Sequence, residues 1–351
     1  STPKPSSAAS DVYKRQTLNV QYNKNPEDIP LFKILQTAIK SGICNSIDTS
    51  PYYGNSEILY GKVLQDLNYT KVKNPELRDS LFVVTKCGRI KENDFDYSFE
   101  AIKKSVNRSL ERLFGSSENG EYLDLVYLHD VEFQTKEQVM EALSALKELK
   151  EEGKVLRIGC SGYPVEVLYD VCISYLKKYG EPLDGILSYS NGCLQNNLFF
   201  NNWITKFRND CQIKLLANGS ILSMSMLSQS EDGIKEFHPC QQQLKNVFDF
   251  NLKKDGNLEL AKILGKYDQR LPLLATKFAI VEANKSKNVT TVLGISKLSE
   301  WEDAEKIYKE LEKNDFKLSD AECKCIEEIQ TFLKANGLYN MMWASGYWSP
   351  H

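Results

Sequence analysis

Four side chains of types that move protons follow one another within the first 129 residues of this chain. Asp48, Lys86 and His129 each end a short apolar run, and Tyr53 follows Asp48 by five residues in a turn that contains glycine and proline. One such residue alone is more often a surface or packing residue. Three successive predicted strands that each end in a reactive group are typical of an enzyme.

The four residue types make chemical sense as a set. Free tyrosine has a pKa of about 10, and a nearby ammonium lowers that pKa by favouring the phenolate. A buried carboxylate can hold the lysine charged, and a histidine can supply a hydrogen bond to a substrate oxygen. Such a set moves a proton on or off a carbonyl or alcohol oxygen. Because it contains no nucleophile, metal site or electron sink, it requires a hydride cofactor.

Short apolar runs alternate with longer amphipathic stretches along the chain, which predicts an α/β fold. Repeated strand–helix units imply parallel strands with right-handed crossovers, and thus a (β/α)8 TIM barrel whose site lies at the C-terminal strand ends. A doubly wound open sheet is the alternative, but the chain has no GxGxxG motif. The expected strands are 44–48, 81–86, 123–129, 156–160, 185–189, 213–217 and 291–295, and the expected helices are 31–42, 56–68, 98–114, 136–152, 164–179, 258–265 and 300–313.

Only seven strands can be counted, and an eighth should precede the helix at 31–42. Residues 1–16 instead form a polar, low-complexity run that is typical of a linker or a translation artefact. We expect this segment to be non-native or disordered, and residues 17–351 to form a single barrel domain. The first strand is therefore predicted to be missing or replaced, and a missing strand would leave an unpaired seam in the barrel.

Composition excludes several classes of protein. The 351 residues are 42% hydrophobic with a net charge of −3 and a pI near 5.9, which gives no basic footprint for nucleic acid or an anionic membrane. No apolar run approaches the roughly 18 residues that span a bilayer, and no secretory signal is expected. The nine cysteines show no zinc-type spacing, so we predict reduced thiols, no metal site and a cytoplasmic location.

The four residues, in this order and on successive predicted strands, resemble the catalytic tetrad of the aldo-keto reductases. That family places its proton-transfer tyrosine five residues after the aspartate, which selects Tyr53 over the neighbouring Tyr52. The similarity runs from about Thr17 to about Tyr347. Its motifs resemble the sugar-oxidising aldose 1-dehydrogenases of the family, which act on D-arabinose or L-galactose, and lie at 47–54, 125–133, 188–189, 194–197, 220–225, 237–240 and 343–346.

The resemblance implies contacts to a nicotinamide ring from the ends of two later strands. Ser161 and Gly162 stand where the family usually has Ser-Asn, so Gly162 can offer only its backbone. Ser188 or Tyr189 stands where many relatives have a glutamine. Whether residue 162 contacts the nicotinamide is therefore open. The choice between Ser188 and Tyr189 is open as well.

The resemblance also implies phosphate contacts from two loops. Ser220, Leu222 and Ser223 follow the strand at 213–217 and resemble the family's pyrophosphate-binding belt, although a plain loop is the alternative. Gly294 and Ser296 follow the last strand and lead into a helix N-terminus, which suits a phosphate.

The last loop predicts NAD rather than NADP. NADP-preferring relatives place a lysine and an arginine around the 2′-phosphate, where this chain has Ile295 and Trp301. Glu302 and Asp303 follow, and an acidic, apolar pocket would repel that phosphate. Lys297 is the one residue here that favours NADP.

The implied activity is oxidation of the C1 hydroxyl of an aldose such as D-arabinose to the lactone, with NAD as cofactor, in carbohydrate metabolism and erythroascorbate synthesis. The alternatives are an NADPH-dependent carbonyl reductase of the same fold and a catalytically impaired, cofactor-binding regulatory protein. The expected partner is a small sugar, without nucleic acid or membrane, bound by a monomer or weak homo-oligomer. Phe133, Trp343 and Trp348 either form an apolar wall for the sugar or dock the tail on the barrel.

Overall fold

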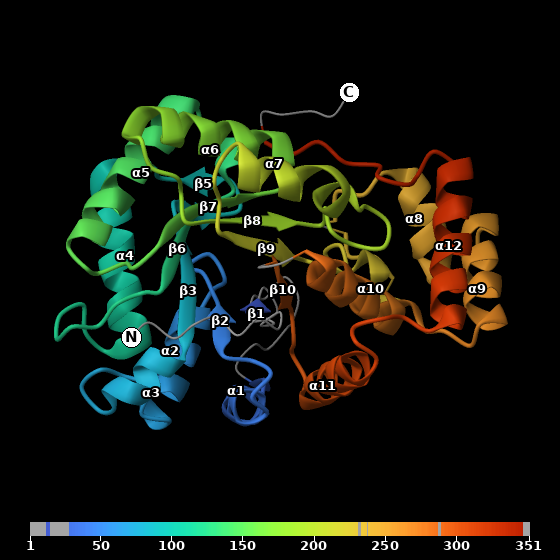
Figure 1. Cartoon of the computed structure of the whole chain (residues 1–351), viewed down its shortest axis with the longest axis horizontal. Helices are drawn as coiled ribbons and strands as arrows, with labels where there is room; N and C mark the ends of the chain where they lie inside the picture. The colour runs from blue at the N-terminus through green and yellow to red at the C-terminus, as the bar shows by residue number, and fades with distance from the viewer. Residues whose placement is uncertain (1–11, 15–27, 231–232, 237, 287–288, 347–351) are drawn as a thin grey trace.

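The chain folds around a closed barrel of eight parallel strands (Figure 1). The computed structural model describes residues 12–14, 28–230, 233–236, 238–286 and 289–346. Going round the barrel, the strands follow chain order, and the last pairs with the first. They are β1 (Val12–Lys14), β2 (Ser46–Asp48), β3 (Phe82–Cys87), β6 (Leu125–His129), β7 (Ile158–Gly162), β8 (Gly185–Tyr189), β9 (Leu215–Gly219) and β10 (Val289–Leu293). The predicted α/β barrel is confirmed.

Helices cover the outside of the barrel (Figure 1). Local sequence sets several of their ends: α5 begins at a capping box between Thr135 and Gln138, and α4 and α6 end at Gly115 and Gly180, which have positive φ. The helices are α1 (Leu31–Lys40), α2 (Ser56–Asp66), α3 (Pro75–Ser80), α4 (Phe99–Phe114), α5 (Lys136–Glu151), α6 (Val165–Tyr179), α7 (Ile204–Asn209), α8 (Gln242–Phe248), α9 (Asp255–Lys266), α10 (Leu271–Lys285), α11 (Leu298–Lys313) and α12 (Asp320–Ala335).

The first barrel position, predicted to be missing or replaced, holds the three-residue strand β1. Tyr13 pairs with Ile47 of β2 on one side and with Leu293 of β10 on the other. The seam between β2 and β10 is therefore paired by a short strand. The rest of the segment 1–16 lies outside the described residues.

A two-stranded antiparallel hairpin follows β3 directly. It consists of β4 (Arg89–Lys91) and β5 (Asp94–Phe95), and Arg89 pairs with Phe95. Because β3 ends at the C-terminal edge of the barrel, the hairpin places the Arg89 side chain at the mouth.

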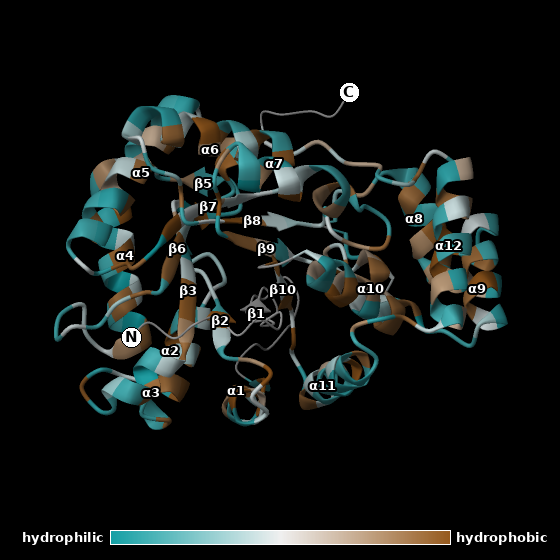
Figure 2. Ribbon diagram, viewed as in Figure 1, coloured by the Kyte–Doolittle hydropathy of each residue, from teal (hydrophilic) through white to brown (hydrophobic). Residues whose placement is uncertain are grey.

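Apolar side chains form three main layers. The barrel interior is filled by a small cluster that includes Tyr127 and Leu187, and a much larger core lies between the strands and the surrounding helices. A further core lies under α8, α9, α10 and α12, which stand to one side of the barrel in Figure 1. Figure 2 shows largely hydrophobic β6, β9 and β10, whereas the helices are mixed.

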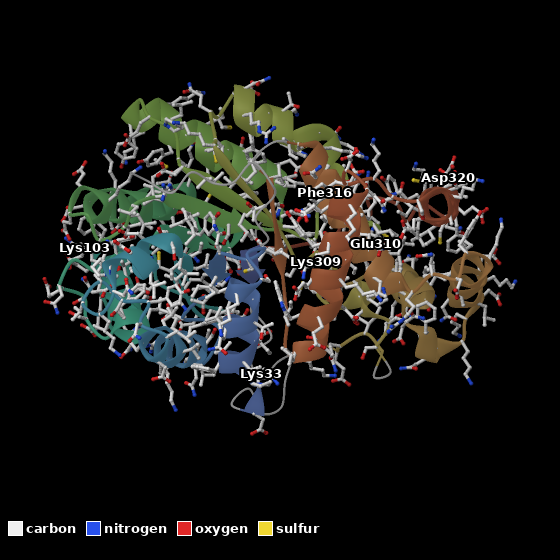
Figure 3. All side chains as sticks on the ribbon, turned by 60° about the horizontal axis from the view of Figure 1, so that its bottom comes forward. Lys33, Lys103, Lys309, Glu310, Phe316 and Asp320 are labelled. Atoms are coloured by element: carbon white, nitrogen blue, oxygen red, sulfur yellow. The ribbon has the colours of Figure 1, made fainter. Side chains whose placement is uncertain are left out.

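Charged side chains cover the outer helix faces (Figure 3). Lys103 of α4 forms ion pairs with Glu148 and Glu152 at the end of α5, and Lys277 of α10 bonds Glu310 of α11 at 2.7 Å. Within the described part of the chain, every helix is too short or too polar to cross a membrane.

Candidate active site

Three neighbouring strands bring Asp48, Lys86 and His129 to the same end of the barrel. Asp48 ends β2, Lys86 is the last residue but one of β3, and His129 ends β6. The order β2–β3–β6 in the sheet makes them neighbours. The structure thus brings the predicted residues of three strands together at the C-terminal edge.

Lys86 and Asp48 form a buried ion pair. Lys86 Nζ donates to Asp48 Oδ1 at 2.5 Å and to the carbonyl oxygen of Thr49 at 3.0 Å. The two side chains are 0% and 1% exposed. A buried ammonium is tolerated only when it is paired and hydrogen-bonded, and these two bonds meet that requirement.

Tyr53 reaches this pair from the turn after β2. Its N–H bonds the carbonyl oxygen of Ser50 at 3.0 Å, which closes the turn, and its side chain is buried. Lys86 Nζ lies 5.0 Å from the centre of the Tyr53 ring. The His129 ring stands edge-on to it, at 5.6 Å and 89°.

The neighbouring Tyr52 occupies a different position. Its half-buried ring lies 5.6 Å from His129, but the cation nearest to it is the Arg89 guanidinium, at 4.3 Å. Of the two tyrosines, Tyr53 is therefore the one that lies beside Lys86, and we retain it as the candidate for proton transfer.

Two residues that the sequence did not single out orient His129. Ser50 Oγ lies 3.1 Å from Nδ1, and Asp130 Oδ2 lies 3.6 Å from Nε2. The Tyr97 hydroxyl donates to the His129 carbonyl oxygen at 2.7 Å. Ser50 and Asp130 lie in the motifs at 47–54 and 125–133. Their closeness in sequence to Asp48 and His129 could have identified them as site residues.

The ends of β7 and β8 lie between the tetrad and the last strands. Ser161 Oγ donates to the Leu128 carbonyl oxygen at 3.1 Å, and Ser188 Oγ accepts from Asn191 Nδ2 at 3.0 Å. Both serines are buried, and so is Gly162. These predicted nicotinamide contacts are placed on the same edge as the tetrad, but both hydroxyls already have protein partners.

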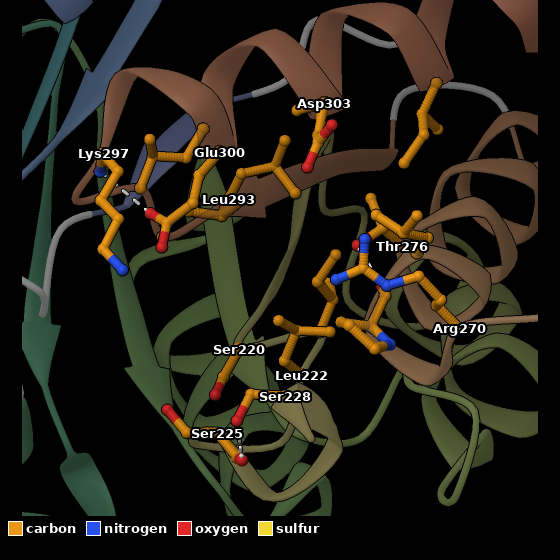
Figure 4. A pocket seen from close by; sticks show the side chains of 18 of the residues that line it. Ser220, Leu222, Ser225, Ser228, Arg270, Thr276, Leu293, Lys297, Glu300 and Asp303 are labelled. Atoms are coloured by element: carbon orange, nitrogen blue, oxygen red, sulfur yellow. Dashed lines mark hydrogen bonds between the residues drawn. The ribbon is translucent and has the colours of Figure 1, made fainter. Parts of the chain in front are cut away.

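A cleft of about 460 Å³ opens at the ends of β9 and β10 (Figure 4). Of the predicted phosphate-binding residues, Ser220, Leu222 and Gly294 line it, whereas Ser223 is fully buried and Ser296 lies outside it. The other residues that line the cleft are Ile221, Met224, Ser225, Ser228, Arg270, Pro272, Leu273, Thr276, Val292, Leu293, Ile295, Lys297, Glu300, Asp303, Ala304 and Ile307.

The loop after β9 presents hydroxyls to one side of this cleft. Ser220, Ser223, Met224 and Ser225 all have positive φ, between 48° and 76°, so the chain turns sharply here. Ser220, Ser225 and Ser228 line the cleft, and Arg270, at the start of α10, adds a guanidinium (Figure 4). Hydroxyls and a guanidinium are donors that a pyrophosphate requires, so this side of the cleft fits that group. Arg270 was not predicted.

The opposite side of the cleft is acidic. Glu300 Oε2 accepts from the N–H groups of Ser296, at 2.6 Å, and Lys297, at 3.1 Å, at the start of α11. Asp303 also lines the cleft, and Lys297 is the nearby cation (Figure 4). Carboxylates can accept hydrogen bonds from ribose hydroxyls, so this side fits the ribose of an adenosine.

Trp343 and His238, which lie in the motifs at 343–346 and 237–240, serve packing. The Trp343 ring stacks on Tyr163 at 4.4 Å and 4°, so the tail is docked on the barrel. His238 Nδ1 accepts from Cys240 N–H at 2.9 Å, and Nε2 donates to the Ser223 carbonyl oxygen at 2.8 Å. Trp348 lies outside the described residues.

Comparisons with known proteins agree with this geometry. Residues 17–330 match the family model described as "Aldo/keto reductase family". The chain is 39% identical to D-arabinose 1-dehydrogenase of Saccharomyces cerevisiae over 95% of this chain and 92% of that protein. It is 30% identical to L-galactose dehydrogenase of Arabidopsis thaliana over 89% and 86%. A glycerol dehydrogenase structure from Gluconobacter oxydans superimposes with a TM-score of 0.64 over 99% and 98% of the chains at 18% identity, which supports the fold alone.

Proposed function

This chain belongs to the aldo/keto reductase family, and from that premise we propose that it oxidises the C1 hydroxyl of an aldose such as D-arabinose to the lactone, with NAD as hydride acceptor. One observation carries the proposal: a clustered Asp48, Tyr53, Lys86 and His129 in a chain 39% identical, over 95% of its length, to a D-arabinose 1-dehydrogenase.

Tyr53 is the proposed proton acceptor. Its phenolate oxygen takes the proton of the C1 hydroxyl as the C1 hydride leaves, so the C–O bond becomes the lactone carbonyl. The Lys86 ammonium, 5.0 Å from the phenol ring, stabilises the phenolate by its charge. Asp48 in turn holds Lys86 in place by accepting a hydrogen bond at 2.5 Å.

His129 is proposed to orient the reacting oxygen. Ser50 Oγ lies 3.1 Å from Nδ1, so we assign the substrate to the other ring nitrogen, Nε2. A hydrogen bond from Nε2 to the C1 oxygen would position the substrate for proton transfer to Tyr53.

NAD, when bound, supplies the hydride acceptor. The residues proposed to hold it are Ser161, Gly162 and Ser188 at the nicotinamide end, and Ser220, Leu222, Gly294 and Arg270 at the pyrophosphate. Ser223 is proposed to shape the first loop and Ser296 the second, since neither lines the cleft. Glu300 and Asp303 support NAD over NADP, because both put negative charge where a 2′-phosphate would need cations.

One observation favours the second candidate, an NADPH-dependent carbonyl reductase. Lys297 lines the cleft beside Glu300 and could pair with a 2′-phosphate. The same four residues would then run the reaction in reverse, with Tyr53 donating its proton to a carbonyl oxygen. Cofactor preference separates the two candidates.

The test is the rate of nicotinamide reduction with a panel of aldoses, with NAD and with NADP. We expect oxidation of D-arabinose with a higher kcat/KM for NAD. Glu300→Ala frees the N–H groups at the start of α11 and should raise kcat/KM for NADP by about tenfold, the worth of one charge-assisted hydrogen bond. Glu302→Ala, on the same helix but outside the cleft, is the control. A wild-type preference for NADPH and carbonyl substrates would support the second candidate instead.

A further inference from the structure

Asp130 follows His129 directly and turns back towards it. Its backbone is left-handed, with φ 58° and ψ 61°, a conformation that few residues other than glycine adopt without strain. This turn brings Oδ2 to 3.6 Å from His129 Nε2. The two side chains are 5% and 4% exposed, so a buried carboxylate lies beside this ring nitrogen.

Arg89 fixes that carboxylate. It forms an ion pair with Asp130 through Nη1, while Nη2 donates to the Glu92 carbonyl oxygen at 2.6 Å and Nε to that of Lys91 at 3.3 Å. Carbonyl oxygens of the hairpin β4–β5 thus accept hydrogen bonds from the other nitrogens of the guanidinium and hold the guanidinium in place. Asp130 is therefore paired and oriented before any ligand arrives.

Aromatic rings lie around the guanidinium of Arg89, the partner of Asp130. The guanidinium carbon of Arg89 lies 4.3 Å from the centre of the Tyr52 ring and 5.2 Å from that of Phe95. Phe133 stacks on Phe95 at 5.2 Å and 19°. A carboxylate paired with an arginine that lies among half-buried aromatic rings matches a sugar, which has hydroxyls at its edge and apolar C–H groups on its faces.

We propose that Asp130 is a specificity-determining residue that accepts a hydrogen bond from the C2 hydroxyl of the sugar. This inference rests on the proposed function, which places the C1 oxygen at His129 Nε2. Neighbouring hydroxyls of a sugar lie about one hydrogen-bond length apart, and the 3.6 Å between Nε2 and Oδ2 matches such a pair. The other neighbour of C1 is the ring oxygen, which has no hydrogen to donate to a carboxylate.

Three pentoses test this contact because they differ only at C2. D-Arabinose and D-ribose are epimers at that carbon, and 2-deoxy-D-ribose lacks the hydroxyl. We expect wild-type kcat/KM with NAD to be on the order of 10- to 100-fold higher for D-arabinose than for the deoxy sugar, as for one hydrogen bond to a charged group. In Asp130→Gly, whose glycine accepts the left-handed backbone, that ratio should fall close to one. The ratio of kcat/KM for D-arabinose to that for D-ribose should also be closer to one in the variant than in the wild type.

Asp130→Asn is the isosteric variant and should reduce the ratio by about tenfold, because the acceptor becomes neutral. It also decides the question if the glycine variant does not fold. Asp94→Asn, an exposed acid in the same hairpin, should leave both rates and the ratio unchanged. The ratio distinguishes sugar recognition from a purely structural role. If the ion pair only stabilised the loop, its loss would change kcat/KM for both sugars by the same factor.

Two results overturn the inference alone: a wild-type enzyme that oxidises D-arabinose and the deoxy sugar equally well, or a ratio that survives in both Asp130 variants. Absence of oxidation of every aldose by the wild type would instead overturn the proposed function, and the inference with it.

Discussion

Glu132 occupies the space that a side chain at position 162 would need. A Cβ on Gly162 would lie 2.4 Å from Glu132 Oε2. The carboxyl group is not free to move away, because its Oε1 accepts from Tyr163 N–H at 3.0 Å and from Ser345 Oγ at 3.1 Å. The glycine that stands where the family usually has asparagine is thus explained by a neighbour on the β6 loop.

We therefore expect Gly162→Ala to lower the free energy of unfolding by about 1–3 kcal/mol, the usual range for overpacking a buried site. In a Glu132→Ala background the same substitution should be close to neutral, since the opposing oxygen is gone. A double-mutant cycle from urea unfolding measures this coupling. Additive effects of the two substitutions would show that the carboxyl group does not restrict position 162.

Tyr53→Phe should remove the proton acceptor and leave packing intact. Positioned proton transfer contributes on the order of 10²–10⁴-fold, so kcat should fall by that factor while cofactor affinity is nearly unchanged. Tyr52→Phe is the comparison, because Tyr52 is adjacent in sequence but lies beside Arg89. A larger kcat loss for Tyr52→Phe than for Tyr53→Phe would reverse the assignment.

Lys86→Met should change both pH dependence and stability. Without the ammonium the phenolate of Tyr53 is less favoured, so oxidation should begin at a higher pH. Asp48 would be left as a buried charge without its lysine, which costs about 3–5 kcal/mol of unfolding free energy. The double variant Asp48→Asn/Lys86→Met should recover much of that stability but none of the activity. A pH profile that does not move would contradict the coupling between Lys86 and Tyr53.

The sequence predicted the parts of the site that depend on strand ends. Parallel strands deliver their last residues to one edge, so Asp48, Lys86 and His129 could be placed together from local patterns alone. Tyr53 followed from the resemblance, because the family places its tyrosine five residues after the aspartate. By contrast, Arg89 reaches Asp130 only through the hairpin β4–β5, whose strands of three and two residues leave almost no pattern.

The segment after β9 was the least predictable part of the fold. Helix α10 (Leu271–Lys285) was missed because Pro272 lies at its start and its apolar residues are not confined to one face, so it packs against two cores at once. Arg270, which precedes it, was missed with it. Glu302 and Asp303 were predicted to oppose a phosphate, but Glu300 is the carboxylate that caps the start of α11. The sequence does not show which of these three acids accepts the N–H groups of Ser296 and Lys297, because that depends on how the chain turns into α11.

The raised pKa of Glu132 leads us to expect that the free energy of unfolding varies with pH. Burial, reinforced by the negative charge of Asp130, raises the pKa of the Glu132 carboxyl from an ordinary 4.5 to about 8. The folded chain therefore keeps this proton up to about pH 8, whereas the unfolded chain loses it near pH 4.5. Because the folded state binds more protons in this window, the stability from Glu132 is present below pH 4.5 and is lost as pH rises towards 8.

Glu132→Gln keeps the shape and a neutral group but cannot ionise. Relative to wild type, this variant should gain unfolding free energy as pH rises through that window, with a slope of up to ~1.4 kcal/mol per pH unit, and the difference should become constant above it. Urea unfolding of both proteins at a series of pH values measures the difference directly. A difference that stays flat from pH 5 to 8, or that changes in the opposite direction, would show that Glu132 is ionised in the folded chain; the Tyr163 N–H and Ser345 hydroxyl would then bind a carboxylate rather than a neutral acid.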